Sequence, residues 1–210
     1  MEHTEQLGAY SYRWTENCFP LGADALALGE FCTVKEGQRV LDLGCGAGAL
    51  LLLCARRCEG LTLTGVEIDP AAAELARDNL ARNGLEGSVI TGDVREAVLP
   101  RGQDLVVSNP PWYAAGTGKE GGPGRMERGS VEDWCRAAAG ALGHKGRFAL
   151  VHSPGRLAEI FAALRRAGLE PKRLQLIQQR RDRLPFAVLV ESVKGGRPGL
   201  EVLPTRIWEV

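Results

Sequence analysis

The sequence predicts an α/β fold in which helices cover both faces of a mostly parallel, doubly wound sheet. Short runs of aliphatic and β-branched residues alternate with segments of helical periodicity, a pattern typical of βαβ units. Glycines cluster directly after the first such run, as they do where open α/β sheets bind ligands at the carboxyl ends of their strands. Near the end of the chain, two apolar runs follow each other with no helix between them. This arrangement predicts one antiparallel strand.

Seven runs have the composition of strands, and five segments have that of helices. The expected strands lie at residues 39–43, 61–68, 87–93, 104–108, 146–153, 173–179 and 186–193. The expected helices lie at residues 23–31, 47–58, 70–84, 131–142 and 154–168. The helix at 70–84 is the most clearly marked, because it begins with a proline, ends at Asn-Gly and keeps its apolar residues on one stripe. We therefore expect a Rossmann-like sheet of seven strands, mostly parallel, with an antiparallel last strand.

Length and charge are those of a globular protein with one main domain. The chain has 210 residues, of which 44% are hydrophobic and 25% charged, and its formal net charge is zero. Binding to a polyanion would therefore depend on local patches of basic residues. No apolar run approaches the roughly 18 residues that span a bilayer, and the first residues lack the pattern of a signal peptide. We expect a cytoplasmic protein that does not enter a membrane.

The cysteines and histidines do not have the spacing of a metal site. Six cysteines are present without a C-x-x-C pair, and only three histidines accompany them. Cys54 and Cys58 lie four residues apart on an expected helix, but no further ligand has matching spacing. We expect small buried side chains and no metal.

The segment DLGCGAG, residues 42–48, marks a ligand-binding turn at the end of the first strand. Gly44, Gly46 and Gly48 would let a ligand approach the backbone closely. A glycine pattern of this kind also fits a dinucleotide fold. However, Asp42 precedes it, and its charge would repel a pyrophosphate while suiting an ammonium or sulfonium group.

Two more acidic residues stand where later strands are expected to end. Glu67 ends the second strand, at a distance along the chain suited to binding both hydroxyls of a ribose. Asp93 ends the third strand and is placed to accept a hydrogen bond from the exocyclic amine of an adenine. A single acid at such a position often only caps a helix. Three acids at successive strand ends favour a binding site.

The motifs DLGCGAG (42–48), GVEID (65–69), TGDV (91–94) and NPPW (109–112) together resemble those of class I S-adenosylmethionine-dependent methyltransferases. The resemblance implies S-adenosylmethionine as cofactor and S-adenosylhomocysteine as product. It implies that Asp42 and the glycine turn hold the methionine moiety, Glu67 the ribose and Asp93 the adenine. The remaining cofactor-binding residues expected are Cys45, Ile68, Val94 and Asn109.

The segment NPPWY, residues 109–113, is the expected catalytic motif. Two successive prolines, Pro110 and Pro111, cannot continue a strand, so they form a rigid turn directly after the run at 104–108. The side-chain oxygen of Asn109 and the carbonyl oxygen of Pro110 are then two fixed acceptors for the hydrogens of an –NH₂ group. Trp112 and Tyr113 offer ring faces on which a planar substrate can stack. The motif also resembles the signature of methyltransferases that act on adenine N6, guanine N2 or a glutamine side-chain amide.

Two outer regions resemble the family of tRNA1(Val) (adenine-37-N6)-methyltransferases: FPLGADALALGEF (19–31) and LPFAVLVESVKGGRPGLEVLP (184–204). GRME (124–127) is similar to an Ala-Arg-His-Glu stretch of that family, with Arg125 matching and Met126 in place of the histidine. The resemblance implies a tRNA partner and a substrate site that includes Asp24 and Arg125. We expect residues 1–36 to form an N-terminal segment of the substrate cleft and residues 37–210 the methyltransferase domain.

Several alternatives remain open at this stage. Ribosomal RNA, modified at guanine N2 or adenine N6, and a protein glutamine are other possible substrates. An NAD-dependent oxidoreductase and a cofactor-binding module without activity are the rival classes. Basic residues around the sixth expected strand would offer an RNA surface if the fold gathered them on one face. They are Arg165, Arg166, Lys172, Arg173, Arg180, Arg181, Arg183, Lys194 and Arg197.

Overall fold

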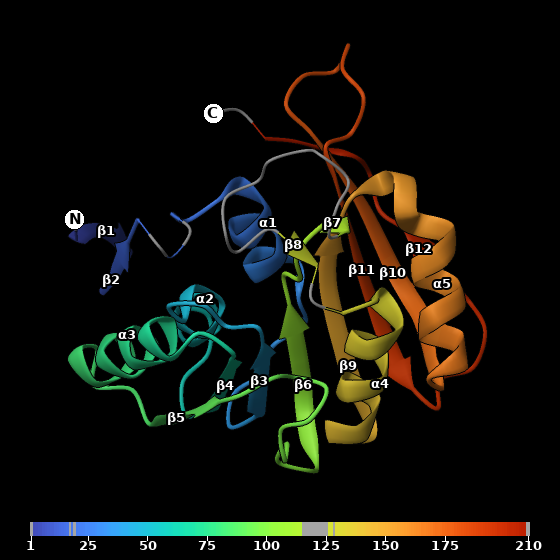
Figure 1. Ribbon diagram of the computed structural model, residues 1–210. Helices are drawn as coiled ribbons and strands as arrows, with labels where there is room; N and C mark the ends of the chain where they lie inside the picture. The colour runs from blue at the N-terminus through green and yellow to red at the C-terminus, as the bar shows by residue number, and fades with distance from the viewer. Residues whose placement is uncertain (1, 17, 19, 115–125, 128, 209–210) are drawn as a thin grey trace.

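The computed structural model describes residues 2–16, 18, 20–114, 126–127 and 129–208. Its centre is a sheet of nine strands in the order β12-β10-β11-β9-β6-β3-β4-β5, with β13 also paired to β10 (Figure 1). The seven longer strands are β3 (Arg39–Leu43), β4 (Thr62–Glu67), β5 (Gly87–Thr91), β6 (Gln103–Ser108), β9 (Leu142–His152), β10 (Leu169–Gln178) and β11 (Ala187–Lys194). They match the seven expected from the sequence, and β11 is the antiparallel one. The expected fold class is confirmed.

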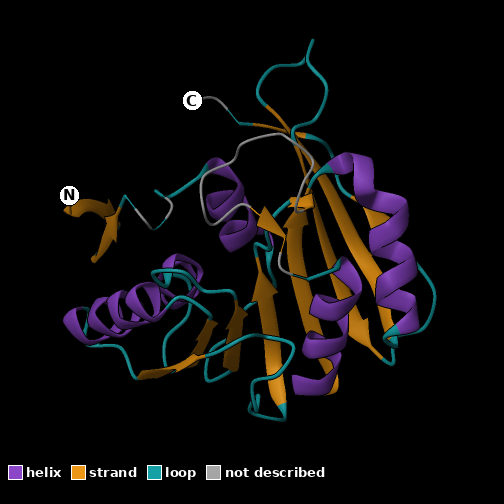
Figure 2. Cartoon of the chain, in the orientation of Figure 1, coloured by secondary structure: helices purple, strands orange, loops and turns teal. Residues whose placement is uncertain are grey.

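Helices cover both faces of the sheet (Figure 2). One face carries α1 (Ala23–Phe31), α2 (Ala49–Ala55) and α3 (Pro70–Arg82), and the other carries α4 (Val131–Ala141) and α5 (Leu157–Arg166), which follows the short turn η1 (Pro154–Arg156). Neighbouring strand residues point to opposite faces, so Val40 packs in the core beneath the first group and Leu41 in the core beneath the second. This burial on both faces explains why the strands read as continuous apolar runs.

Local capping explains where two of the helices begin. The Asp69 carboxylate accepts from the backbone N–H of Ala71 at 2.8 Å, and a proline occupies the first helical position of α3. Ser130 and Asp133 form a capping box at the start of α4, each side chain accepting a hydrogen bond from the backbone of the other residue. Both helices begin within one residue of the expected positions.

The structure contains short strands that the sequence analysis did not anticipate. β1 (Glu2–Leu7) and β2 (Tyr10–Thr15) form an antiparallel hairpin ahead of α1, and β7 (Tyr113–Ala114) pairs with β8 (Met126–Glu127). β12 (Glu201–Val202) and β13 (Arg206–Ile207) both pair with β10, which extends the expected sheet of seven strands to nine. These strands have two to six residues, so local apolar periodicity carries little signal for them.

Asn79 of α3 and Asn83, the residue directly after this helix, hold the hairpin. The Asn83 side chain exchanges hydrogen bonds with the backbone N–H and C=O of Ser11, at 2.9 and 2.8 Å. Asn79 does the same with Arg13, at 3.0 and 2.8 Å, and also donates to the carbonyl of Ala47 in the glycine turn. The amide side chains thus satisfy the outer backbone groups of β2 as a neighbouring strand would. This docking places Tyr12 over the carboxyl edge of the sheet.

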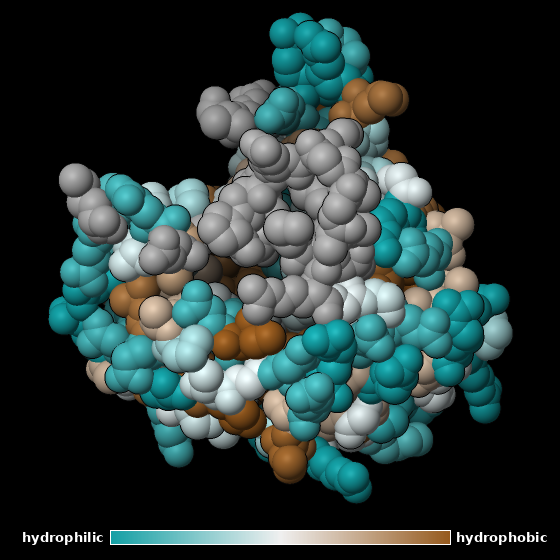
Figure 3. Space-filling view, in the orientation of Figure 1, coloured by the Kyte–Doolittle hydropathy of each residue, from teal (hydrophilic) through white to brown (hydrophobic). Residues whose placement is uncertain are grey.

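Outside the residues drawn in grey, the face seen in Figure 3 is covered mainly by hydrophilic side chains, with apolar ones between them. Among the helices of the described ranges, none combines the length and the apolar character needed to cross a bilayer. Within the same ranges, no cluster of three or more His, Cys, Asp or Glu side chains is arranged to hold a metal ion.

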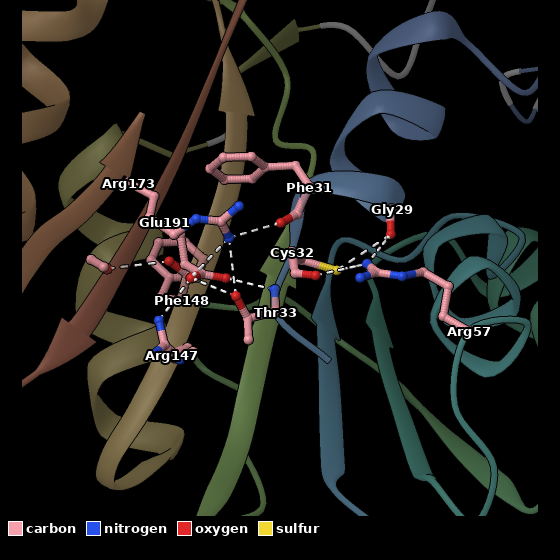
Figure 4. A network of polar contacts seen from close by, with 10 residues as sticks. Gly29, Phe31, Cys32, Thr33, Arg57, Arg147, Phe148, Arg173 and Glu191 are labelled. Carbon is pink, nitrogen blue, oxygen red and sulfur yellow. Dashed lines mark hydrogen bonds and ion pairs between the residues drawn. The ribbon is translucent and has the colours of Figure 1, made fainter. Parts of the chain in front are cut away.

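A buried carboxylate joins the end of α1 to the sheet (Figure 4). Glu191 of β11 is fully buried and accepts from the backbone N–H and the hydroxyl of Thr33, at 2.7 and 2.9 Å. Arg147 of β9 donates to it at 2.8 Å, and Arg173 of β10 lies 3.4 Å away while also donating to the carbonyl of Phe31. Three strands and the segment after α1 therefore share one charge network.

We expect Glu191→Ala to lower the free energy of unfolding by about 3 kcal/mol, because it leaves Arg147 and Arg173 without their buried partner. For a domain of this size the loss corresponds to a fall in Tm of roughly 6–12 °C. Glu74→Ala, which removes an exposed ion pair with Arg77, is the control and should change the free energy by less than about 0.5 kcal/mol. Equal losses in the two variants, measured by urea denaturation, would contradict this role of Glu191.

Candidate active site

A cavity of about 840 Å³ lies at the carboxyl edge of the sheet, where β3, β4, β5 and β6 end. It has the size range of a small-molecule or cofactor site. Thirteen of the residues expected at the site line it: Asp24, Asp42, Gly44, Cys45, Gly46, Glu67, Ile68, Asp93, Val94, Asn109, Pro110, Pro111 and Trp112. They come from four strand ends and α1, so the fold brings together segments that are far apart in the sequence.

Asp42 is the most unusual group in the cavity wall. Its side chain is fully buried, and neither carboxylate oxygen has a hydrogen-bond partner among the described residues. Burial raises the pKa of Asp42 well above its usual range, and the neighbouring charge of Glu67 raises it further. An unpaired buried carboxylate is costly unless a cation compensates it. Asp42 therefore fits a ligand that carries an ammonium group.

The glycine turn follows Asp42 directly, and the backbone N–H groups of Gly44 and Cys45 donate to the carbonyl of Val66, at 2.8 and 3.0 Å. Gly44 has φ +70°, and a Cβ there would lie 2.8 Å from the ring of Trp134, so only glycine fits. Gly48 is the N-cap of α2 and does not itself line the cavity. Trp134 of α4 is a lining residue that the sequence analysis missed, because within the apolar stripe of α4 it reads as an ordinary core residue.

Glu67 connects the ends of β3 and β4. Its two carboxylate oxygens accept from the backbone N–H groups of Gly46, at 2.8 Å, and Asp69, at 2.9 Å. Each oxygen keeps a further lone pair, which the hydroxyls of a ribose can use. Ile68 follows with 40% of its surface exposed and lines the cavity. The geometry fits the ribose site expected from the sequence.

Asp93 lies at the edge of the cavity, but it is already engaged. Its carboxylate accepts from the backbone N–H of Arg95 at 2.9 Å and from the guanidinium of the same residue at 2.9 and 3.1 Å. Arg95 itself lines the cavity and was not singled out in the sequence. Val94 lies between them on the same wall. An adenine at this position would meet the ion pair of Asp93 and Arg95. The Asp93 carboxylate still has lone pairs that can accept a hydrogen bond from the adenine amine.

Asn109 and Asp24 meet although they are 85 residues apart. The amide of Asn109 donates to the carboxylate of Asp24 at 3.1 Å, and Asp24 also accepts from the backbone N–H of Ala25 at 2.9 Å. Because an ionised carboxylate only accepts hydrogen bonds, this contact identifies the nitrogen of the Asn109 amide and leaves its oxygen for another donor. The contact fixes the acceptor that the sequence analysis expected at the catalytic motif.

The residues after Asn109 form the wall beside it. Pro110 is buried, and Pro111 and Trp112 are half-buried at the cavity. The ring of Trp112 stacks on His152, with centroids 6.1 Å apart. Burial lowers the pKa of His152 to about 4, and Ser153 donates to its Nδ1 at 2.7 Å, so the ring is neutral and Nε2 carries the proton. His152 was not recognised in the sequence.

Two expected substrate residues cannot be placed at the cavity. Arg125 lies outside the residues that the structure describes, and the backbone of Tyr113 is placed in β7 without a description of its side chain. Three other residues do reach the cavity from elements whose arrangement the sequence did not reveal. Tyr12 and Cys18 come from the segment before α1, and Phe186 directly precedes β11.

Comparison with known proteins gives consistent matches. Residues 22–163 match the family of the methyltransferase small domain. A tRNA1(Val) (adenine(37)-N6)-methyltransferase from Musicola paradisiaca is 38% identical over 101 residues, which cover 46% of this chain and 41% of the relative. An enzyme of the same name from Haemophilus influenzae is 32% identical over 139 residues, covering 62% and 60%. The chain thus matches about half the length of these curated relatives.

Solved structures show the same architecture. A predicted O-methyltransferase from Agrobacterium tumefaciens superposes with a TM-score of 0.72 at 29% identity, covering 88% of this chain and 86% of that one. TrmN from Thermus thermophilus superposes with a TM-score of 0.59 at 25% identity, covering 81% of this chain and 48% of that one.

Proposed function

Because the chain belongs to the methyltransferase small domain family, we propose that it is an S-adenosylmethionine-dependent N-methyltransferase acting on a planar exocyclic amine. The proposed substrate is adenine N6 in tRNA. The observation that carries the reaction type is the contact between Asn109 and Asp24, since it directs an amide oxygen to the place where an –NH₂ group would be held. A cytoplasmic location, in contact with tRNA, is part of the same proposal.

The cavity fits the cofactor by the chemistry of its donors and acceptors. Bound S-adenosylmethionine supplies an activated methyl group on a sulfonium. Asp42 would hold the ammonium of the methionine moiety, Glu67 the ribose hydroxyls and Asp93 the adenine amine, with Cys45, Ile68 and Val94 in the surrounding wall. The match between an unpaired buried carboxylate and a cationic group is the strongest part of this assignment.

The residues at the catalytic motif would orient and activate the amine. The Asn109 oxygen and the Pro110 carbonyl accept the two hydrogens of the –NH₂ group, so that its lone pair points away from them. Both acceptors are held in place before the substrate arrives: Asp24 fixes the amide of Asn109, and the two prolines fix the turn. They stabilise the positive charge that develops on nitrogen, which is an interaction strongest in the transition state. Trp112 provides a ring face against which a planar base can stack.

The choice of adenine N6 in tRNA is supported by the names of two relatives, both called tRNA1(Val) (adenine(37)-N6)-methyltransferase. The similar structure described as a predicted O-methyltransferase points to a different acceptor atom. Asn109-Pro110 favours the amine, because a hydroxyl has a single hydrogen and leaves one of the two acceptors unused. Ribosomal RNA and a protein glutamine also present planar amines and remain alternative substrates of the same mechanism.

A thermal shift experiment tests the cofactor. We expect S-adenosylhomocysteine to raise Tm, because a ligand present at about a hundred times its Kd stabilises the folded protein by roughly 2.7 kcal/mol. NAD should leave Tm unchanged. A shift with NAD alone would contradict the methyltransferase proposal and favour an oxidoreductase.

Transfer from isotopically labelled S-adenosylmethionine to bulk tRNA, taken from cells that lack this gene, tests the substrate. Nucleosides from the digested RNA would be separated and identified by mass spectrometry. We expect label in N6-methyladenosine. Label in a 2′-O-methylated nucleoside would overturn the N-methyltransferase assignment, and unlabelled tRNA would redirect the search to ribosomal RNA or a protein glutamine.

A further inference from the structure

The loop between β10 and β11, residues 179–185, lies at the same edge of the sheet as the cavity. β11 is antiparallel to both β9 and β10, and β9 is parallel to β6, so β10 runs in the direction of β6 and ends at the same edge. The loop projects beyond this edge, at the top of Figure 1. Phe186, directly after the loop, lines the cavity, and its backbone N–H donates to Ile177 at 2.9 Å.

The sequence predicts an RNA surface only if the fold places the basic residues of this region on one face. The fold does not do so. Arg165 and Arg166 pair with Glu170 and Glu132, at 3.0 and 3.2 Å. The ammonium of Lys194 donates to two backbone carbonyls, at 2.6 and 2.7 Å. Arg173 belongs to the buried network of Glu191. These four side chains have structural partners.

The arginines of the loop at residues 179–185 keep a net positive charge that is exposed. Arg180 pairs with Asp182 at 3.1 Å, but both side chains are more than 60% exposed, so the pair contributes little. Among the described residues, the side chains of Arg181 and Arg183 meet no carboxylate, and both are exposed. Leu184 beside them is 90% exposed. The turn is held by hydrogen bonds from Arg183 N–H to the Arg180 carbonyl and from the Gln178 side chain to the Arg183 carbonyl.

We propose that residues 179–185 form an RNA-binding loop that contacts the phosphate backbone beside the nucleotide held at Asn109. This inference rests on the proposed function, because it takes RNA as the substrate. Three arginines against one aspartate give the loop a net positive charge, whereas carboxylates predominate around the cavity itself. A substrate with a neutral base and a charged backbone satisfies both regions: the base enters the cavity and the phosphates remain outside, on the arginines.

The short separation in sequence between the loop and the cavity supports this placement of the base in the cavity and of the phosphates on the arginines. Arg183 precedes the cavity residue Phe186 by three positions, so its backbone lies within about 10 Å of that wall. Phosphates adjoining a flipped-out nucleotide would therefore be within reach of the long side chains of Arg181 and Arg183. Leu184 offers an apolar contact for a ribose or an unstacked base, a feature that single-stranded RNA presents more often than a duplex does.

The test compares two double variants that remove the same charge. Arg181→Ala with Arg183→Ala changes the loop, and Arg101→Ala with Arg197→Ala removes two exposed arginines at the opposite edge of the sheet, before β6 and after β11. Binding of dye-labelled bulk tRNA would be measured by fluorescence anisotropy over a range of salt concentrations. We expect the loop variant to bind roughly tenfold more weakly at 0.1 M salt and its salt slope to fall by about 1.4, for two lost phosphate contacts. The opposite-edge variant should retain the wild-type slope.

Further measurements separate this inference from the proposed reaction. Stabilisation by S-adenosylhomocysteine should be equal in both variants and the wild type, and kcat/KM for bulk tRNA should fall only in the loop variant. Equal loss of binding in the two variants, or an unchanged slope in the loop variant, would overturn the RNA-binding loop. So would a loop that is needed for binding to phosphatidylglycerol vesicles and not to tRNA. If tRNA binds through the loop but accepts no methyl group, the loop stands and the proposed substrate fails.

Discussion

Asn109→Ala is expected to lower kcat by about 10²–10³-fold while the affinity for S-adenosylhomocysteine stays nearly unchanged. The substitution removes the oxygen that Asp24 holds in position, and with it one of the two acceptors for the amine. Because this interaction strengthens as charge develops on nitrogen, its loss should appear in kcat more than in KM. Steady-state kinetics with bulk tRNA and calorimetry with S-adenosylhomocysteine measure the two quantities.

Two variants of Asp24 test whether it acts by holding the Asn109 amide in position. Asp24→Ala keeps the Asn109 oxygen but frees its amide to rotate, so we expect a smaller fall in kcat than for Asn109→Ala. Asp24→Asn keeps one oxygen that can accept from the Asn109 amide, while its –NH₂ group then faces the backbone N–H of Ala25, so we expect kcat between those of Asp24→Ala and the wild type. If Asn109→Ala left turnover unchanged, the amine would be oriented by other groups and the proposed mechanism would be wrong.

Asp42→Asn is expected to weaken the binding of S-adenosylhomocysteine at least about thirtyfold, which corresponds to the loss of roughly 2 kcal/mol from a buried charge pair. The same substitution should raise the Tm of the protein without cofactor at neutral pH. The asparagine has nearly the same shape but carries no charge, and it therefore removes a carboxylate that is buried without a partner among the described residues.

The pH dependence follows from the direction of the shift. Burial raises the pKa of Asp42 in the folded protein above its value in the unfolded chain. The stability that the protonated side chain contributes is therefore fully present below the unfolded pKa and is lost as the pH rises through the folded pKa. Cofactor affinity should change in the opposite sense, increasing as Asp42 ionises and becomes able to pair with an ammonium.

Asp104→Asn is a suitable control, because Asp104 pairs with Arg39 at the other edge of the sheet. It should leave the affinity for S-adenosylhomocysteine unchanged. If Asp42→Asn also bound the cofactor with wild-type affinity, the assignment of Asp42 to the ammonium would have to be abandoned.

The sequence was most informative where local and global signals agreed. The longer strands follow from runs that are mostly apolar, because burial on both faces of the sheet favours apolar side chains at successive positions. α3 follows from its proline, its aspartate cap and its apolar stripe. The cavity lining could be anticipated for a related reason: in a parallel sheet every strand end at the carboxyl edge meets its neighbours, so Asp42, Glu67 and Asn109 converge without any knowledge of the loops.

The sequence was least informative where a contact depends on the approach of distant segments. The hairpin of β1 and β2 is held by the side chains of Asn79 and Asn83, and nothing in residues 2–15 identifies those partners. Trp134 against Gly44 was missed for the same reason. Arg95 lies only two residues after Asp93, and its pairing depends on the local turn that brings the guanidinium back onto the carboxylate. The interpretation of the basic residues depended on their partners as well, since Arg165 and Arg166 each pair with a glutamate, whereas Arg181 and Arg183 meet no carboxylate among the described residues.

By itself, then, the sequence determined the α/β class, the seven longer strands with an antiparallel last one, and the chemical types at the carboxyl edge, because these depend on periodicity and on residues adjacent in the chain. Only the tertiary structure decided which of those groups are charged, paired or available. Asp42 is fully buried and has no partner in the part of the chain that the structure describes, Asp93 is engaged by Arg95, and Asn109 is oriented by Asp24. Such states depend on burial and on the geometry between side chains, and these properties arise only when the chain is folded.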